Sequence, residues 1–143
     1  MSIESDNVVV LLVEDNPADV VFFEEAVEAT RTPVTLHLAD DGSEALQFLR
    51  RLGSHADAPR PDVIVLDLNL PIMSGREVAM EMASDPELNT IPVAVLTTSE
   101  NEECVCDMFA KGRCLYFTKT DNFKKLQGIV REIAAHARNL ESR

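Results

Sequence analysis

The chain lacks the features that mark membrane, secreted and nucleic-acid-binding proteins. Its longest unbroken apolar run, Val8–Val13, is far too short to span a bilayer, and the segment Met1–Asn7 has neither the basic nor the apolar part of a secretion signal. Only 13 Lys and Arg residues stand against 25 Asp and Glu residues, and the net charge of −12 opposes binding to a phosphate backbone. We therefore expect a cytoplasmic protein that binds neither membranes nor DNA. Adaptation to high salt would also explain the acidic excess.

Cysteine and histidine are scarce. The three cysteines, Cys104, Cys106 and Cys114, include no Cys-x-x-Cys pair, and none of the three histidines lies near them at the spacing of a metal site. These patterns argue against a disulfide framework, a zinc site and a catalytic triad. We expect the cysteines to be small apolar residues in or near the core.

The length and composition fit one globular domain. A chain of 143 residues that is 45% hydrophobic and 27% charged has room for one core and little room for a second folded unit. We expect a single domain over residues 1–143, with its core in about residues 7–138 and no output domain such as a DNA-binding helix-turn-helix.

Short apolar runs rich in β-branched residues punctuate the sequence. Runs without polar alternation suit strands that are buried on both faces of a parallel sheet. The expected strands are Val8–Val13, Val34–Ala39, Val63–Leu66, Val93–Leu96 and Cys114–Thr118.

Helical patterns follow these runs along the chain. The expected helices begin at Pro17 with Asn16 as the cap, run from a cap at Ser43 to a stop at Gly53, and cover Gly75–Ser84, Glu100–Lys111 and about Phe123–Ala137. Phe109 and Phe123 are expected in the core. The repeated strand–helix order predicts an α/β fold, in which helices cover both faces of a parallel sheet.

Polar side chains follow four of the expected strands at their carboxyl ends. Glu14 and Asp15 follow the first strand, and Asp67 follows the third. Thr97 follows the fourth strand, and Lys119 follows the fifth. Because ligands of open parallel sheets bind outside the carboxyl ends of the strands, we expect these side chains to form one site.

The residue types at this edge suit phosphoryl transfer. Crowded carboxylates repel one another unless a cation lies among them, and oxygen ligands without His or Cys favour Mg²⁺ or a similar ion. Lys119 and Thr97 could then contact an anion beside the metal, and a central carboxylate could form an aspartyl phosphate. Taken singly, Asp15 could be a helix cap and Lys119 a solvated loop residue.

Four segments resemble the response-regulator receiver domain of two-component signalling. They are Leu11–Asn16, Leu66–Pro71 followed by Gly75, Val95–Ser99 and Phe117–Lys119. The resemblance covers about residues 7–138 and implies a doubly wound (βα)5 domain with the flavodoxin-like strand order 2-1-3-4-5. The Thr-Thr-Ser run and the long connector before the third strand are similar to small regulators that partner phytochrome-type histidine kinases.

The resemblance implies a role for each residue of the site. Asp67 corresponds to the phosphoacceptor, and Asp15, Asp67 and the backbone carbonyl of Asn69 correspond to direct ligands of Mg²⁺ or Mn²⁺. Glu14 stands at an acidic position that usually reaches the metal through water. Because Glu is longer than Asp by one methylene, it could alter the metal geometry.

The remaining roles concern the response to phosphorylation. Thr97 corresponds to the switch hydroxyl, Lys119 to the residue that pairs with a phosphoryl oxygen, and Tyr116 to an aromatic switch residue, although Tyr116 could simply be a packed strand aromatic. Thr98 is expected to shape access to the phosphoryl group. Pro71 and Gly75 correspond to structural positions in the loop after Asp67.

One pair departs from the family pattern. The family usually has Lys-Pro, often with a cis peptide bond, where this chain has Lys119 and Thr120. A cis bond before a residue other than proline costs about 2.5–4 kcal/mol, so a trans bond is the expectation here unless the fold enforces cis. The position of Lys119 is the inference that this departure affects most.

The implied function is signalling by a phosphoprotein that assists its own modification and is not a classical enzyme. A sensor histidine kinase, of the phytochrome type in the narrower resemblance, would donate the phosphoryl group. The face made by the fourth helix, fifth strand and last helix would then change and contact a downstream protein, a relay protein or a second copy of the chain.

Two alternatives remain open at this point. A degenerate receiver could act as a docking module that needs no phosphorylation, although the acceptor, acidic pair, hydroxyl and lysine are all present. A phosphohydrolase of the haloacid-dehalogenase type would need an acid two residues after its nucleophile, where this chain has Asn69.

Overall fold

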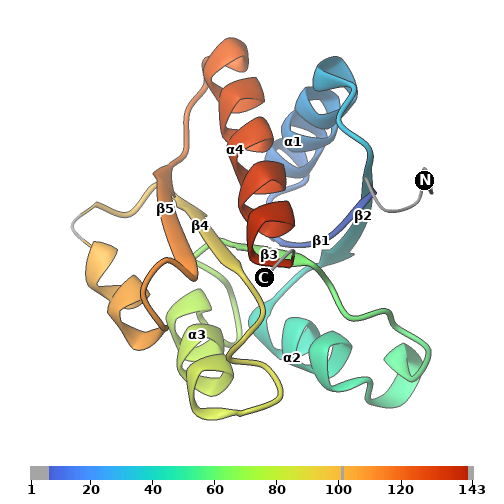
Figure 1. Ribbon diagram of the computed structural model, residues 1–143, viewed down its shortest axis with the longest axis vertical. Coiled ribbons are helices and arrows are strands. Elements are labelled where there is room, and N and C mark those ends of the chain that lie inside the picture. Colours follow the sequence, from blue (N-terminus) through green and yellow to red (C-terminus); the bar gives the residue numbers. More distant parts are fainter. Residues whose placement is uncertain (1–6, 101, 142–143) are drawn as a thin grey trace.

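The structure, a computed structural model, describes residues 7–100 and 102–141, with the side chains of 140 and 141 left out. The polar segment before residue 7 therefore lies outside the described residues. Five parallel strands form one sheet in the order β2-β1-β3-β4-β5, which confirms the predicted fold (Figure 1). The strands are β1 (Val8–Val13), β2 (Val34–Ala39), β3 (Val63–Leu66), β4 (Val93–Thr97) and β5 (Cys114–Thr118).

Helices cover both faces of this sheet (Figure 1). The helices α1 (Pro17–Thr30) and α4 (Phe123–Glu141) lie side by side on one face, and α2 (Gly42–Arg50) and α3 (Gly75–Ser84) lie on the other. Successive side chains of β1 point to opposite faces of the sheet and belong to two separate cores. Leu11 and Val13 pack with α2 and α3, whereas Val10 and Leu12 pack with α1 and α4. The strands are thus buried on both faces, as their continuous apolar runs predicted.

Local capping sets where the helices begin. Asn16 caps α1 by accepting a hydrogen bond from the backbone nitrogen of Ala18 at 2.9 Å, as predicted. The predicted cap of α2 at Ser43 is wrong, because Asp41 accepts a 2.8 Å hydrogen bond from the backbone nitrogen of Glu44. The predicted stop at Gly53 is also late, since Arg51 takes the left-handed conformation (φ 55°) that closes α2.

The predicted fourth helix is mostly wrong. Over the range 100–111, of which residue 101 is not described, the structure has only a short 3-10 helix, η3 (Glu103–Met108). Phe109 is buried as expected and Val105 is also buried, but Met108 is exposed. Among the described residues of this range, Val105 and Phe109 are the buried ones, and so few buried side chains suit a short 3-10 helix better than a full α-helix.

The prediction that the cysteines form no disulfide is also wrong. Cys106 of η3 and Cys114, the first residue of β5, form a disulfide with their Cα atoms 5.2 Å apart. Cys104 is a free thiol and is exposed rather than part of the core. Sequence spacing could not reveal the pairing, because it depends on how the turn after η3 leads back to the sheet.

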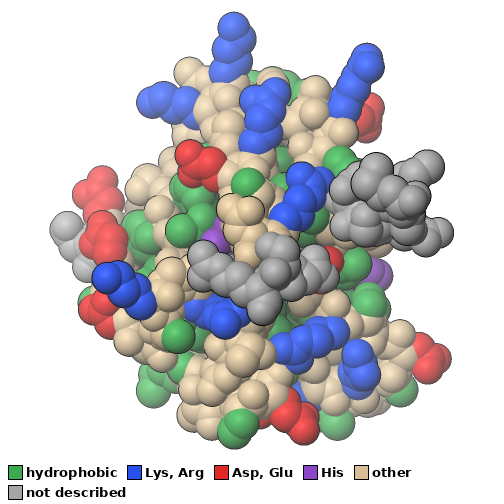
Figure 2. Space-filling model, in the orientation of Figure 1, with side chains coloured by type: hydrophobic (Ala, Val, Ile, Leu, Met, Phe, Trp, Pro, Cys, Tyr) green, Lys and Arg blue, Asp and Glu red, His purple; other side chains and the backbone are tan. Residues whose placement is uncertain are grey.

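Charged side chains of both signs are spread over the face that Figure 2 shows. Lys and Arg side chains occupy several separate places there, interspersed with apolar and acidic side chains. Of the helices that the structure describes, none combines the length and apolar character needed to cross a bilayer.

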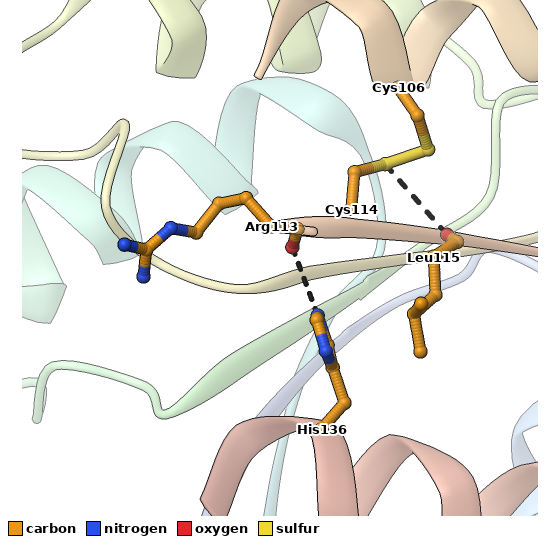
Figure 3. Close-up of a disulfide and its surroundings, with 5 residues drawn as sticks. All are labelled: Cys106, Arg113, Cys114, Leu115 and His136. Atoms are coloured by element: carbon orange, nitrogen blue, oxygen red, sulfur yellow. Dashed lines mark hydrogen bonds between the residues drawn. A yellow bond between two sulfur atoms is a disulfide. The ribbon is translucent and has the colours of Figure 1, made fainter. Parts of the chain in front are cut away.

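His136 links α4 to the start of β5 and should make stability depend on pH. Its Nε2 atom donates to the backbone oxygen of Arg113 at 2.9 Å (Figure 3), and burial, opposed in part by this bond, lowers the histidine pKa below 6.5. Stabilisation is therefore present above 6.5 and is lost as pH falls through the lowered folded-state pKa. Between about pH 7.5 and 5.5, urea unfolding should show the native protein losing more stability than His136→Gln. Equal losses would contradict the prediction.

Candidate functional site

Backbone hydrogen bonds bring the strand ends to one edge of the sheet. The nitrogen of Asp67 bonds to the oxygen of Val13 at 3.3 Å, just beyond the pairing of β1 with β3. The nitrogen of Lys119 bonds to the oxygen of Thr97 at 2.9 Å, just beyond the pairing of β4 with β5. The sheet register therefore fixes the positions of the residues predicted to form the site.

The centre of the site is the ammonium group of Lys119. Its Nζ atom lies 2.6 Å from Glu14 Oε1, 2.7 Å from Asp19 Oδ2 and 2.9 Å from Asp67 Oδ2. The Glu14 and Asp67 side chains are only 6% and 7% exposed, so water screens these ion pairs weakly. A single cation thus holds three carboxylates together, including two of the predicted acidic residues.

Burial and contacts with oppositely charged groups shift the pKa values of Lys119 and Glu14 in opposite directions. Burial by itself would lower the pKa of Lys119, but hydrogen bonds to Asp19, Glu14 and Asp67 outweigh it and raise that pKa well above its ordinary value. Burial raises the pKa of Glu14, with a smaller contribution from Asp67, although contacts with Lys119 and Asn16 oppose the increase. Lys119 therefore stays charged beside the carboxylates.

The predicted carboxylate ligands of a metal ion also come together. One oxygen each of Glu14, Asp15 and Asp67 lies within 4.8 Å of the others. Asp15 is exposed, and Asn69 is held beside the cluster because its backbone nitrogen donates to Asp67 Oδ1 at 3.0 Å. A set of hard oxygen donors without His or Cys suits Mg²⁺ or Mn²⁺.

Ser99 connects the predicted switch residues. Its nitrogen donates to Oγ1 of the fully buried Thr97 at 3.3 Å, its Oγ accepts from Asn69 Nδ2 at 2.7 Å, and its backbone oxygen accepts from the Tyr116 hydroxyl at 2.6 Å. Thr98 is exposed beside this network. Burial raises the pKa of Tyr116, and the nearby Glu103 raises it further, so the hydroxyl remains a hydrogen-bond donor.

Sequence reasoning missed two members of the site. Asp19 lies in the first turn of α1 and was not assigned to the site, and Ser99 was assigned only to a motif that resembles the family. The signal for Asp19 was its place three residues after the Asn16 cap, because the first turn of α1 lies at the same edge as the strand ends. No sequence signal identified its pairing with Lys119 across 100 residues.

The structure shows whether the peptide bond between Lys119 and Thr120, where the family usually has Lys-Pro, is cis or trans. No cis peptide bond occurs in the described residues, so Lys119 and Thr120 are joined in trans. Lys119 nevertheless reaches Asp67, and the missing proline does not displace it from the site. After Asp67, the loop passes through Pro71 and then the exposed Ile72, which has a φ of 66°.

Gly75→Ala should disrupt the loop that carries Asp67. An added Cβ atom would lie 2.0 Å from the Asp67 backbone oxygen and 2.7 Å from the Leu68 Cα atom, and these backbone atoms cannot move aside cheaply. We expect the free energy of unfolding to fall by about 3 kcal/mol in urea titrations. The matched control is Gly128→Ala in α4, where a Cβ atom meets nothing within 4 Å and the helix should gain up to about 1 kcal/mol. Native stability of Gly75→Ala would contradict the proposed close contact.

Comparisons with known proteins agree with this geometry. The family described as the response regulator receiver domain matches residues 10–131. The curated protein Response regulator Rcp1 of Synechocystis sp. is 42% identical over 125 residues, which cover 85% of each chain. The probable methanogenesis regulatory protein FilR2 of Methanothrix harundinacea is 33% identical over 90% of this chain and 82% of its own.

Solved structures show the same similarity in three dimensions. The phosphorylated cyanobacterial phytochrome response regulator RcpA is 44% identical, with a TM-score of 0.78 over 89% of this chain and 91% of its own. The Mn²⁺-bound form of Rcp1 is 41% identical, with a TM-score of 0.76 over 85% and 91% of the two chains. From these matches and the acidic site at the strand ends, we conclude that the chain belongs to the response regulator receiver domain family.

Proposed function

We propose that this receiver takes a phosphoryl group from a phosphohistidine of a sensor histidine kinase onto Asp67, and that the change in its surface transmits the signal to another protein. The observation that carries the proposal is the contact of Lys119 with both Glu14 and Asp67, which also lie close to Asp15. The same residues offer a nucleophile, ligands for a divalent cation and a cation for the incoming phosphoryl oxygens.

The proposed reaction uses one oxygen of Asp67. This oxygen attacks phosphorus, the bond between phosphorus and the imidazole nitrogen breaks, and the released imidazole takes a proton from solvent. Lys119 then shifts its contact from Asp67 Oδ2 to a phosphoryl oxygen, since an acyl phosphate no longer has a free carboxylate to pair with. Water later hydrolyses the acyl phosphate and restores Asp67.

The carboxylates of Glu14, Asp15 and Asp67, together with the Asn69 backbone carbonyl, would hold Mg²⁺ or Mn²⁺. The ion would neutralise the charge that builds up on the transferring phosphoryl group. Because Lys119 occupies Glu14 Oε1 and Asp67 Oδ2 in this structure, the protein must redistribute these contacts when it loads the site. Asp19 can retain the ammonium group during that exchange.

We propose that Thr97 and Tyr116 transmit the effect of phosphorylation at Asp67 to the protein surface. The Thr97 hydroxyl would leave Ser99 and donate to the phosphoryl group, and the Ser99 carbonyl would release Tyr116. Movement of these side chains would alter η3, β5 and the start of α4, which is the surface that a downstream or relay protein, or a second copy of the chain, would recognise.

A phytochrome-type kinase is the proposed donor. The support comes from two similar structures, since RcpA is a cyanobacterial phytochrome response regulator and AtBRR, 30% identical, is a bacteriophytochrome response regulator. An open groove of about 490 Å³ beside α1 leads to Lys119 and is lined by Ala18, Phe22 and Thr120 among others. Its apolar and polar lining suits entry of a protein side chain that carries the phosphoryl group.

The direct test is incubation with acetyl phosphate, followed by measurement of intact mass. We expect a gain of one phosphoryl group with Mg²⁺ or Mn²⁺ and no gain when EDTA is present. Absence of any gain in folded protein with bound Mg²⁺ would reject the proposal and favour a docking module. Transfer from purified phytochrome-type kinases, compared with kinases of other sensor types, then tests the proposed partner.

A further inference from the structure

The disulfide joins two elements that flank the site. Cys106 lies on η3, which follows the Ser99 segment, and Cys114 begins β5, which leads to Tyr116 and Lys119 (Figure 3). The bond closes across only eight residues of sequence, so it acts on the local position of η3 rather than on the whole fold.

The orientation along β5 places the disulfide and Tyr116 on the same side of the sheet. Side chains two residues apart in a strand point to the same face, which relates Cys114 to Tyr116. Cys106, Cys114 and Tyr116 all pack against the core formed with α2 and α3. A change in the distance between η3 and β5 would therefore alter the packing of the Tyr116 ring and the hydrogen bond from its hydroxyl to the Ser99 carbonyl.

Few other interactions hold η3 in place among the described residues. Val105 and Phe109 are buried, and Glu102, just before η3, forms an ion pair with Arg76 of α3. The helix itself depends on bonds three residues apart, such as the 3.1 Å bond from Phe109 N to Cys106 O, and such helices are intrinsically weak. The disulfide is the one covalent restraint on this segment.

The surroundings of Cys106 and Cys114 would allow the disulfide to open and close. Cys106 and Cys114 are half-buried, so reagents can reach them after modest opening, and Cys104 is exposed two residues away. The Leu115 carbonyl oxygen lies 3.8 Å from Cys114 Sγ (Figure 3), where it would accept the proton of a Cys114 thiol in the reduced form. The acidic neighbours Glu103 and Asp107 would repel negatively charged disulfides and favour neutral reagents.

We propose that Cys106 and Cys114 form a reversible redox switch, whose closed disulfide holds η3 against β5 and restrains the Tyr116–Ser99 contact. Closure by a neutral low-molecular-weight disulfide removes one hydrogen from each thiol, forms one S–S bond and releases two reduced thiols of the reagent. Opening by a dithiol reductant reverses both changes. Cys104 takes no part in the cycle.

This switch would also regulate the proposed function. Release of Tyr116 from Ser99 is a step of the proposed response to phosphorylation, so a closed disulfide should oppose it. That part of the inference rests on phosphorylation at Asp67, whereas the effect on η3 does not.

The test compares protein treated with 2-hydroxyethyl disulfide and protein treated with dithiothreitol. In Cys104→Ser, iodoacetamide added after denaturation should label no cysteine in the oxidised chain and two in the reduced chain, and the oxidised chain should carry no added reagent mass. Hydrogen exchange of residues 102–113 should be at least about tenfold faster in the reduced form. Two labelled cysteines or added reagent mass in oxidised Cys104→Ser, or equal exchange in both forms, would overturn the proposal.

Two variants separate this proposal from the proposed function. Cys104→Ser should keep the redox dependence of hydrogen exchange, and the double variant Cys106→Ser with Cys114→Ser should exchange like the reduced protein under both conditions. If the native chain also accepts phosphate, its autodephosphorylation rate should differ between the two oxidation states, and equal rates would remove the regulatory link. If it accepts no phosphate, hydrogen exchange still decides whether the switch operates on η3.

Discussion

Asp67→Asn is expected to abolish phosphorylation by acetyl phosphate while the protein remains folded. Asparagine has nearly the same shape as aspartate, but its amide does not act as the anionic nucleophile. The substitution also leaves Lys119 paired with Glu14 and Asp19, so no buried ammonium is left without a partner. Intact mass should show no phosphoryl gain in the variant at any Mg²⁺ concentration that modifies the native protein.

The matched control is Asp62→Asn, because Asp62 directly precedes β3 and Asp67 directly follows it. Asp62 Oδ2 accepts a 2.8 Å hydrogen bond from the Val9 nitrogen, and an asparagine oxygen can accept the same bond. This variant should be phosphorylated like the native chain. Full phosphorylation of Asp67→Asn would mean that another residue is the acceptor, and peptide mapping would then identify it.

Lys119→Ala should strongly destabilise the folded protein when no divalent ion is present. The three carboxylates that Lys119 now binds would be left facing one another, two of them nearly buried. Loss of one partner of such an ion pair costs about 3 kcal/mol or more, and we expect the free energy of unfolding to fall by that amount in EDTA. Urea titrations followed by circular dichroism measure this loss.

Mg²⁺ should restore more stability to Lys119→Ala than to the native protein. A ligand stabilises the folded state according to its affinity, and in the variant no ammonium competes for Glu14 and Asp67. Phosphorylation should nevertheless be slower, because one cation for the phosphoryl oxygens is missing. Lys111→Ala, which removes an exposed positive charge in the turn before β5, serves as the control for net charge. If Mg²⁺ raises the free energy of unfolding of Lys119→Ala and Lys111→Ala by the same amount, Lys119 does not compete with the ion.

Most of the fold could be predicted because its signals are local. The apolar runs of β1, β2, β3 and β5 match the observed strands at both ends, since strands buried on both faces leave a continuous pattern in the sequence. Gly75–Ser84 is likewise a helix as predicted, because Ser74 and Glu77 form a capping box within one turn. The errors at Ser43 and Gly53 arose where several residues could serve as cap or stop.

The candidate site was predictable to the extent that strand direction determines it. Glu14, Asp15, Asp67, Thr97 and Lys119 were assigned to one edge because each follows a parallel strand. Their roles as phosphoacceptor, metal ligands and switch residues stay predictions until the experiments above are done. The ion pair between Asp19 and Lys119 could not be predicted, because it depends on how α1 packs on the sheet.

The sequence by itself determined the layered α/β fold, the strands and the chemical character of the site, because hydrophobic periodicity and strand direction are properties of neighbouring residues. Tertiary structure alone decided the other features. It paired Cys106 with Cys114, shortened the fourth helix to η3, and placed one ammonium group among three carboxylates. Each of these depends on distances between segments far apart along the chain or across a turn, and such distances are fixed only when the helices pack on the sheet.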